Sequence, residues 1–144
     1  MNVEISNMTL DDLDKIKDIL TTEFDDFWNY NILKSEIENS LSKYIIARWE
    51  KQIVGFAGII DTLDQMEITN VVVRKDMRNH GIGDLLLKNL IMLSKGKDKI
   101  YLEVNEKNIN AIKLYEKNGF KKCGLRKKYY NKIDDAILME LKLI

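Results

Sequence analysis

The chain has 144 residues, 45% of them hydrophobic and 32% charged, with a formal net charge of zero, one cysteine and one histidine. The balanced charge argues against a nucleic-acid partner that is held by bulk positive charge. One cysteine cannot form an internal disulfide, and one cysteine with one histidine cannot form a zinc cluster. No metal is therefore expected. The length fits a single domain over residues 1–144, and the absence of a signal peptide or a long apolar run predicts a cytoplasmic protein with no membrane partner.

The first half of the chain predicts two helices and three strands. Residues 3–5 form a short strand, and residues 8–24 carry apolar side chains at helical spacing with Thr9 as the N-cap. Residues 29–41 predict a second helix. Residues 43–60 predict a hairpin of two β-rich runs that turns at residues 50–52.

The second half alternates strands and helices. Strands are predicted at residues 65–73 and 99–104, helices at 81–95 and 108–118, and two final strands at 120–130 and 135–144. Gly119 is expected to stop the last helix as its C′ residue. The order β-α-α-β-β-β-α-β-α-β-β predicts a mixed α/β (α+β) fold with one mixed sheet.

A glycine turn, Arg78-Asn79-His80-Gly81-Ile82-Gly83, lies between a predicted strand and a predicted helix. Because Gly81 and Gly83 lack a Cβ atom, a bulky anion such as a pyrophosphate can approach the backbone N–H groups at the helix start. A dinucleotide-binding motif needs a third glycine where Leu86 stands, and a P-loop needs lysine where Asp84 stands. On the residues alone, glycines that serve only helix–strand packing explain the turn equally well.

Glu103 stands out in the strand predicted at 99–104. The apolar side chains of that strand share one face, and Glu103 lies on the other. Because a strand next to helices is normally covered, this carboxylate belongs either in solvent at the strand's end or in a cleft. In a cleft it would be a natural general base.

The following helix offers two further candidates. Asn108 is a good N-cap residue, and that role alone would explain it. Tyr115 has Ala111, Ile112 and Leu114 nearby on the same helix, so core packing is its expected role. His80, in the glycine turn, is expected to be solvated.

Together these motifs resemble the GCN5-related N-acetyltransferase (GNAT) superfamily. Residues 78–83 match its Gln/Arg-x-x-Gly-x-Gly/Ala motif between a strand and a helix, and residues 108–120 match its later Asn-x-x-Ala-Ile-x-Leu-Tyr-x-x-x-Gly-Phe pattern. Residues 102–120 and 125–141 are most similar to the ribosomal-protein-alanine N-acetyltransferase type. On the substrate side the chain departs from that type, with Phe27 for a proline, Asn29 for a serine, and no proline after Tyr130.

The resemblance implies acetyl-CoA as the co-substrate. It assigns the pyrophosphate to the backbone N–H groups of the glycine turn, and the pantetheine amides to the edge of the preceding strand, where an N–H near Val72 polarises the thioester carbonyl. The side chain of Asn108, at the start of the helix predicted over residues 108–118, contacts the pantetheine arm. The implied cofactor-binding residues are Val71, Val72, Val73, Arg78, Asn79, His80, Gly81, Ile82, Gly83 and Asn108.

The resemblance also implies the catalytic pair and the acceptor site. Glu103 acts as general base on the incoming ammonium, directly or through water, and Tyr115 acts as general acid toward the departing thiolate. Trp28, Tyr129 and Tyr130 form the walls of a peptide-amine entrance. An N-terminal α-amine has a pKa of about 7.7–8.0, against roughly 10.4 for lysine, so it is the easier amine to deprotonate.

Three functions are open on this basis. The first is acetylation of a peptide or protein N-terminus, with the alanine of a small-subunit ribosomal protein as candidate acceptor. The second is acetylation of a small amine (a polyamine, an aminoglycoside or an amino acid) in an acidic pocket built from Asp25, Asp26 and Glu67, although the tyrosine pair favours a peptide. The third is a non-catalytic acyl-CoA-binding module, against which the presence of both Glu103 and Tyr115 speaks.

Overall fold

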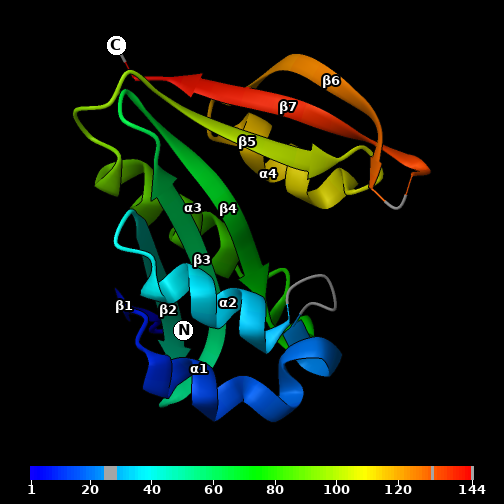
Figure 1. Ribbon diagram of the computed structural model, residues 1–144. Helices are drawn as coiled ribbons and strands as arrows, with labels where there is room; N and C mark the ends of the chain where they lie inside the picture. Colours follow the sequence, from blue (N-terminus) through cyan, green and yellow to red (C-terminus); the bar gives the residue numbers. More distant parts are fainter. Residues whose placement is uncertain (25–28, 131, 144) are drawn as a thin grey trace.

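The computed structural model describes residues 1–24, 29–130 and 132–143. Its central feature is a seven-stranded sheet with the strand order β1-β2-β3-β4-β5-β7-β6 (Figure 1). Only β4 and β5 are parallel neighbours, and the other pairs are antiparallel. The elements are β1 (Glu4–Asn7), α1 (Leu10–Ile16), α2 (Tyr30–Glu38), β2 (Ser42–Trp49), β3 (Gln52–Asp61), β4 (Gln65–Val73), α3 (Ile82–Leu93), β5 (Lys99–Asn105), α4 (Ile109–Lys117), β6 (Lys121–Tyr130) and β7 (Asp134–Lys142).

The predicted order of strands and helices is confirmed, and so is the mixed fold class. The hairpin turn is confirmed as well, because Glu50 and Lys51 both have positive φ between β2 and β3. Gly119 follows α4 with a φ of 94°, as a C′ glycine does. None of the helices formed by the described residues is long and apolar enough to cross a lipid bilayer.

The single helix predicted over residues 8–24 is wrong beyond Ile16. A 3-10 turn (η1, Lys17–Ile19) and a π-helical turn (η2, Leu20–Phe24) follow α1 instead. Two adjacent β-branched residues, Thr21 and Thr22, disfavour a regular helix here, and the Thr22 hydroxyl donates back to the Ile19 carbonyl at 3.4 Å. The irregular turns still bury Leu20 and Phe24.

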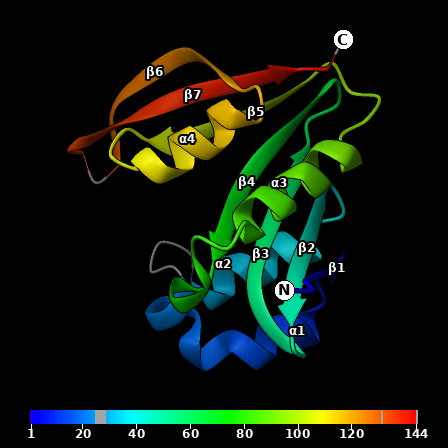
Figure 2. The ribbon, with the colours of Figure 1, turned by 180° about the vertical axis from the view of Figure 1, so that it is seen from behind.

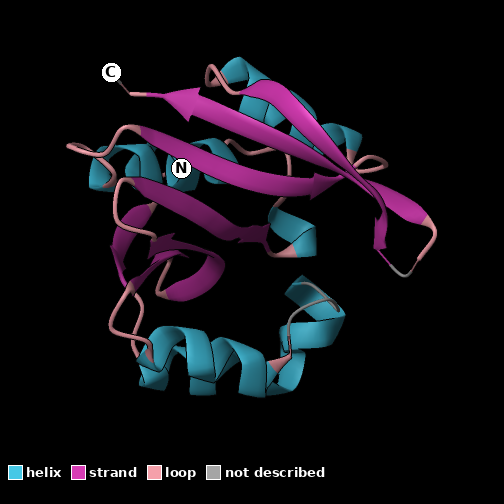
Figure 3. Ribbon diagram, turned by 45° about the horizontal axis from the view of Figure 1, so that its top comes forward, coloured by secondary structure: helices cyan, strands magenta, loops and turns pink. Residues whose placement is uncertain are grey.

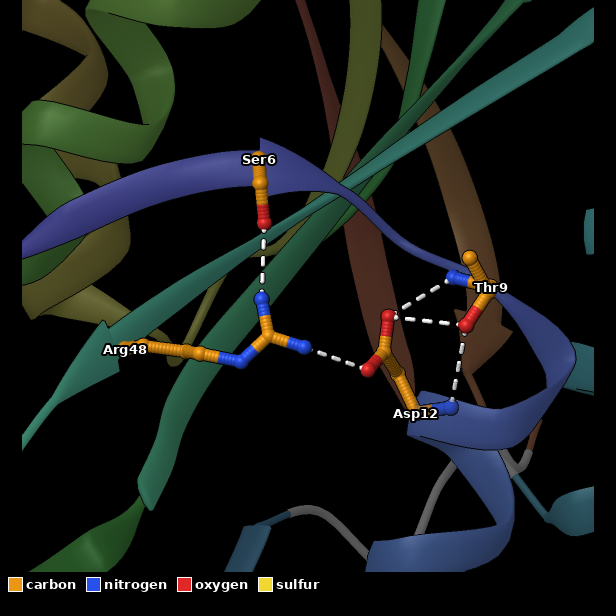
Figure 4. Close-up of polar contacts among 4 residues, drawn as sticks. All are labelled: Ser6, Thr9, Asp12 and Arg48. Carbon is orange, nitrogen blue, oxygen red and sulfur yellow. Dashed lines mark hydrogen bonds and ion pairs between the residues drawn. The ribbon is translucent and has the colours of Figure 1, made fainter. Parts of the chain in front are cut away.

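The start of α1 is fixed as the sequence predicts. Thr9 caps the helix, and its backbone N–H donates to Asp12 at 2.9 Å while its hydroxyl accepts from the Asp12 N–H at 3.2 Å. The same buried Asp12 carboxylate pairs with Arg48 of β2, whose other nitrogen donates to Ser6 of β1 at 2.8 Å (Figure 4). One carboxylate therefore ties the first helix to the edge of the sheet.

The helices cover the sheet on both faces. α1 and α2 pack on one face, over a core that includes Leu13, Leu33 and Phe56, whereas α3 and α4 lie on the opposite face (Figures 2 and 3). The second core, under α3 and α4, includes Leu86 and Tyr115. The sheet therefore separates an α1–α2 side from an α3–α4 side.

Two features open the sheet in its middle. Gly58 of β3 lies opposite Asn70, and the next residue, Ile59, lies opposite Ile68, so Thr69 is an extra residue that makes a β-bulge in β4. The parallel pairing of β4 with β5 ends at Ile68 and Leu102, and beyond it the two strands lean apart toward their carboxyl ends (Figure 1). Ligands of sheets with parallel strands bind at such carboxyl ends.

Candidate active site

A cleft of about 400 Å³ fills the opening between β4, β5 and α4. The bulged part of β4 forms one wall, and the end of β5 with the first turns of α4 forms the other. The residues that line it are Glu67, Ile68, Thr69, Asn70, Val71, Val72, Glu103, Val104, Asn105, Asn108, Ala111, Tyr115 and Tyr129.

The cleft brings together seven of the residues predicted from the sequence, from β4, β5, α4 and β6: Glu67, Val71, Val72, Glu103, Asn108, Tyr115 and Tyr129. Val73 and the glycine turn at residues 78–83 lie beyond its lining, at the end of β4 and the start of α3. Trp28, Asp25 and Asp26 lie outside the described residues. The backbone of Tyr130 ends β6, and its side chain is likewise outside the described part.

Glu103 lies in the cleft and not in open solvent, with its side chain only 15% exposed. Its Oε1 atom accepts a hydrogen bond from the Tyr101 hydroxyl at 2.7 Å and pairs with the Arg126 guanidinium at 2.9 Å. Burial and the bond to the Glu103 carboxylate raise the pKa of Tyr101, so its phenol stays protonated and keeps donating. The Glu103 carboxylate is therefore held in place by Tyr101 of the same strand and by the Arg126 guanidinium.

A second carboxylate faces the same space from β4. Glu67 lies opposite Tyr101 in the strand register and lines the cleft beside Glu103. Burial, and then the negative charge of Glu103, raises the pKa of Glu67, while Arg126 opposes that shift. Of the acidic pocket predicted from Asp25, Asp26 and Glu67, this is the member that the described residues place in the cleft.

Tyr115 combines core packing with access to the cleft. It is 7% exposed, its ring lies 5.7 Å from that of Phe120, and it belongs to the core under α4, which confirms the packing prediction. It is also part of the cleft lining. A residue in this position can present its hydroxyl to a ligand while its ring stays fixed by the core.

Asn108 is the N-cap of α4, as predicted. Its side-chain oxygen accepts from the Ala111 N–H at 3.2 Å, and both residues line the cleft. The start of α4 therefore faces the opening. That end of a helix carries partial positive charge and favours polar or anionic groups of a ligand.

The glycine turn contains two residues in the left-handed backbone region. Gly81 caps α3 with a φ of 79°, Asn79 has a φ of 66°, and no heavy atom lies within 4 Å of a Cβ built on Gly81. Open space therefore adjoins the helix start, which suits a bulky anion. A Cβ on Gly83 would instead lie 3.4 Å from a methyl group of Leu114, an ordinary contact distance, so α3 packs on α4 at this residue without requiring glycine. His80 is exposed, as predicted.

Arg78 has a structural contact that the motif did not predict. Its guanidinium donates to the carbonyl oxygens of Val73 at 3.3 Å and of Phe24 at 3.2 Å. It thereby joins the π-helical turn to the end of β4, next to the strand edge where the cofactor arm is expected.

The β-bulge is held by a buried tyrosine. The Tyr44 hydroxyl lies 3.0 Å from the Thr69 hydroxyl and accepts from the Asn70 amide at 3.2 Å. A Cβ on Gly58 would lie 2.3 Å from the Tyr44 ring, so only glycine lets the ring lie flat on β3. Burial raises the pKa of Tyr44 to about 12. Within the described residues, the buried Asn70 Oδ1 has no hydrogen-bond partner.

A wide irregularity in β6 turns Tyr129 toward the cleft. Arg126 pairs with Ala136 and Tyr130 with Asp134, so residues 127–129 face only Asp135. Lys128 has a φ of 50°, and its N–H donates to the Asp135 carboxylate at 2.7 Å. The Arg126 guanidinium lies 5.0 Å from the centre of the Tyr129 ring. Sequence reasoning named Tyr129 but missed Arg126, because no local pattern indicates its pairing across three strands.

Comparisons with known proteins agree with this geometry. The profile of the Acetyltransferase (GNAT) family matches residues 10–120. A Bacillus subtilis protein provisionally named a ribosomal protein bS18-alanine N-acetyltransferase is 31% identical, over 94% of this chain and 92% of its own length. The crystal structure of the ribosomal-protein-S18-alanine N-acetyltransferase from Escherichia coli superposes with a TM-score of 0.89 at 28% identity, covering 99% of this chain and 94% of that one. An Elizabethkingia anophelis GNAT structure with acetyl-CoA bound has a TM-score of 0.78 at 23% identity, over 99% of both chains.

Proposed function

The chain belongs to the acetyltransferase (GNAT) family and is an N-acetyltransferase, and we propose that its acceptor is the α-amine of a protein N-terminus. The N-terminal alanine of a small-subunit ribosomal protein is the leading candidate, because the similar Escherichia coli and Bacillus subtilis proteins are named for that reaction. A cytoplasmic location is part of this proposal. The observation that carries it is one cleft lined by Glu103, Tyr115 and Tyr129.

Acetyl-CoA fits the α3–α4 side of the cleft. Beyond Ile68 the strand β4 no longer pairs with β5, so backbone groups of Val71–Val73 on that edge are available to the amides of a pantetheine arm. The start of α3, with open space at Gly81, would receive the pyrophosphate. Asn108 would contact the arm from the start of α4.

The reaction needs a neutral amine. The acceptor α-ammonium would lose a proton to Glu103, directly or through water, with Glu67 as a second carboxylate beside it. The amine nitrogen then attacks the thioester carbonyl carbon. A backbone N–H near Val72 would stabilise the negative charge that develops on the carbonyl oxygen.

Departure of the thiolate completes the transfer. The carbon–sulfur bond breaks, Tyr115 would donate its phenolic proton to the sulfur, and the attached nitrogen would release its second proton to solvent, from which Tyr115 regains one. A thiol has a pKa of about 8.5 in the cysteine model, so proton donation assists its departure without being compulsory. The products are the acetylated N-terminus and CoA.

Mass spectrometry tests the acceptor class. A peptide that begins with alanine and contains an internal lysine is incubated with the protein and acetyl-CoA, beside the same peptide blocked at its N-terminus. Addition of one acetyl group to the free N-terminus, and none to the blocked peptide, is the expected result. Acetylation of spermidine but of neither peptide would favour the small-amine function, and CoA binding without turnover on any amine would favour a binding module.

A further inference from the structure

Arg126 lies beside the cleft, where it contacts two of the lining residues, Glu103 and Tyr129, and surface stability does not explain this position. It lies on β6, an edge strand, and its side chain is 51% exposed while it pairs with the 15%-exposed Glu103. An ion pair with so much solvent access contributes little to stability. Its guanidinium nevertheless has a fixed place, because it also lies 5.0 Å from the Tyr129 ring centre, within cation–π range.

The Glu103–Arg126 pair offers a ligand a hydrogen-bond acceptor, the carboxylate, beside a group of donors, the guanidinium N–H groups. Tyr101 and Arg126 both bond to the same oxygen, Oε1. The Arg126 contact uses one terminal nitrogen, and a guanidinium carries five N–H groups in a fixed planar fork. The second oxygen of the Glu103 carboxylate and the remaining N–H groups of the Arg126 fork therefore belong to one ion pair at the edge of the cleft.

A peptide N-terminus has the matching pattern. Its α-ammonium is a donor, and the carbonyl oxygen of the same residue, one carbon further along, is an acceptor. A lysine side chain and a polyamine present an ammonium without a neighbouring carbonyl. A carboxylate beside a guanidinium can therefore distinguish an α-amino carbonyl unit from other amines.

We propose that Arg126 and Glu103 together recognise the first residue of the acceptor: Glu103 Oε2 receives an N–H of the α-ammonium, and Arg126 donates to the carbonyl oxygen of that residue. This assignment rests on the proposed N-terminal acetyltransferase function and makes Arg126 its specificity-determining residue. In this scheme the irregularity of β6 between Arg126 and Tyr130 serves to place the Tyr129 ring against the Arg126 guanidinium.

The test pairs a variant with an acceptor that lacks the carbonyl. Wild type, Arg126→Gln and Arg126→Lys are assayed on an alanine-starting peptide and on its alkene analogue, in which a carbon–carbon double bond replaces the first peptide bond. Each variant is compared with wild type on the same acceptor, so the different amine pKa values of the two acceptors cancel. Lys122→Gln removes a charge from the same strand four residues before Arg126 and is the matched control.

Arg126→Gln is expected to lower kcat/KM on the peptide about 10- to 100-fold, mainly through KM, the effect of losing one charge-assisted hydrogen bond. On the alkene analogue the change should stay within about twofold. Arg126→Lys should recover part of the loss, because it keeps the charge without the fork. Lys122→Gln should match wild type, and all variants should keep their affinity for acetyl-CoA.

Two results would overturn the assignment. An equal loss on both acceptors would mean that Arg126 acts only by orienting Glu103, and an unchanged peptide KM would mean that it contacts no acceptor. Either result would leave the proposed function intact, because wild type would still acetylate the peptide. A wild-type enzyme that acetylates no α-amine would overturn the function itself and this inference with it.

Discussion

The two sides of the cleft are built in different ways. On the α3–α4 side, the strand edge, the glycine turn and the helix start come from one continuous segment, residues 65–93, and act mainly through backbone groups. On the acceptor side, Glu103, Arg126 and Tyr129 come from β5 and β6, meet through side chains, and depend on a strand irregularity. A site made by one segment can be recognised as a motif, whereas a site made by paired side chains on separate strands cannot.

This difference predicts that variants on the proposed acceptor side change kcat or the KM for the acceptor, while variants on the other side change acetyl-CoA affinity. The largest effect is expected for Glu103→Gln. Loss of a general base costs about 10²–10⁴-fold in rate, and the loss should shrink at high pH, where more of the amine is already neutral. Initial rates across pH measure this, with calorimetry for acetyl-CoA affinity, which should not change.

Glu106→Gln is the matched control for this variant, because it removes a carboxylate three residues further along, outside the cleft lining. A wild-type to mutant rate ratio that stays constant across pH would assign Glu103 a structural role. Glu67, whose pKa is raised by burial, would then be the carboxylate to test next.

Tyr115→Phe is expected to have the next largest effect. Tyr115 belongs both to the core and to the cleft lining, so this variant tests a residue shared by packing and catalysis. The ring and its packing on Phe120 remain, and only the hydroxyl is lost. As a general acid its loss should lower turnover at least about tenfold with an unchanged melting temperature. A thioester whose thiol has a lower pKa should partly restore the rate, since that thiolate needs less protonation.

The control for Tyr115→Phe is Tyr30→Phe, which removes an exposed hydroxyl bonded to Asp14 at 2.6 Å, at a residue outside the cleft lining. Full turnover in folded Tyr115→Phe would limit this residue to packing and binding.

Two alanine variants separate anion binding from backbone conformation on the other side. Gly83→Ala adds a Cβ at ordinary contact distance from Leu114 and should keep or slightly raise stability, because alanine is the better helix former by about 0.5–1 kcal/mol. If phosphate oxygens approach this backbone, CoA affinity should nevertheless fall about tenfold.

Gly81→Ala provides the contrast. Its φ of 79° is left-handed, so a Cβ there costs about 1–2 kcal/mol of stability although the space around it is open. Chemical denaturation and calorimetry measure both quantities for each variant. Unchanged CoA affinity in a folded Gly83→Ala protein would place the pyrophosphate elsewhere.

What could be predicted from the sequence follows from how local each feature is. The N-cap at Thr9 and the turn at Gly81 each depend on residues within one short segment, and the sequence predicts both. The helix predicted over residues 8–24 is too long, because its apolar spacing continues into turns that are not α-helical. The Thr69 bulge and the Arg126–Glu103 pair depend on strand register and on partners distant in sequence. The spacing of apolar residues along the chain contains no information on either.

Tyr44→Phe, at a residue outside the cleft lining, tests whether the bulge is held by a side chain or by the sheet alone. The ring still lies on Gly58, but the Asn70 amide and the Thr69 hydroxyl lose their buried partner. The free energy of unfolding should fall by about 1–3 kcal/mol near neutral pH. Because folding raises the pKa of Tyr44 from 10.0 to about 12, the folded state holds this proton more tightly than the unfolded state. The wild type should therefore lose further stability as pH rises from 10 to 12, by about 2–3 kcal/mol from this group, and Tyr44→Phe should lack that part of the loss. Urea denaturation at neutral and alkaline pH measures both effects, and equal alkaline losses in the two proteins would show that the hydroxyl is not buried as described.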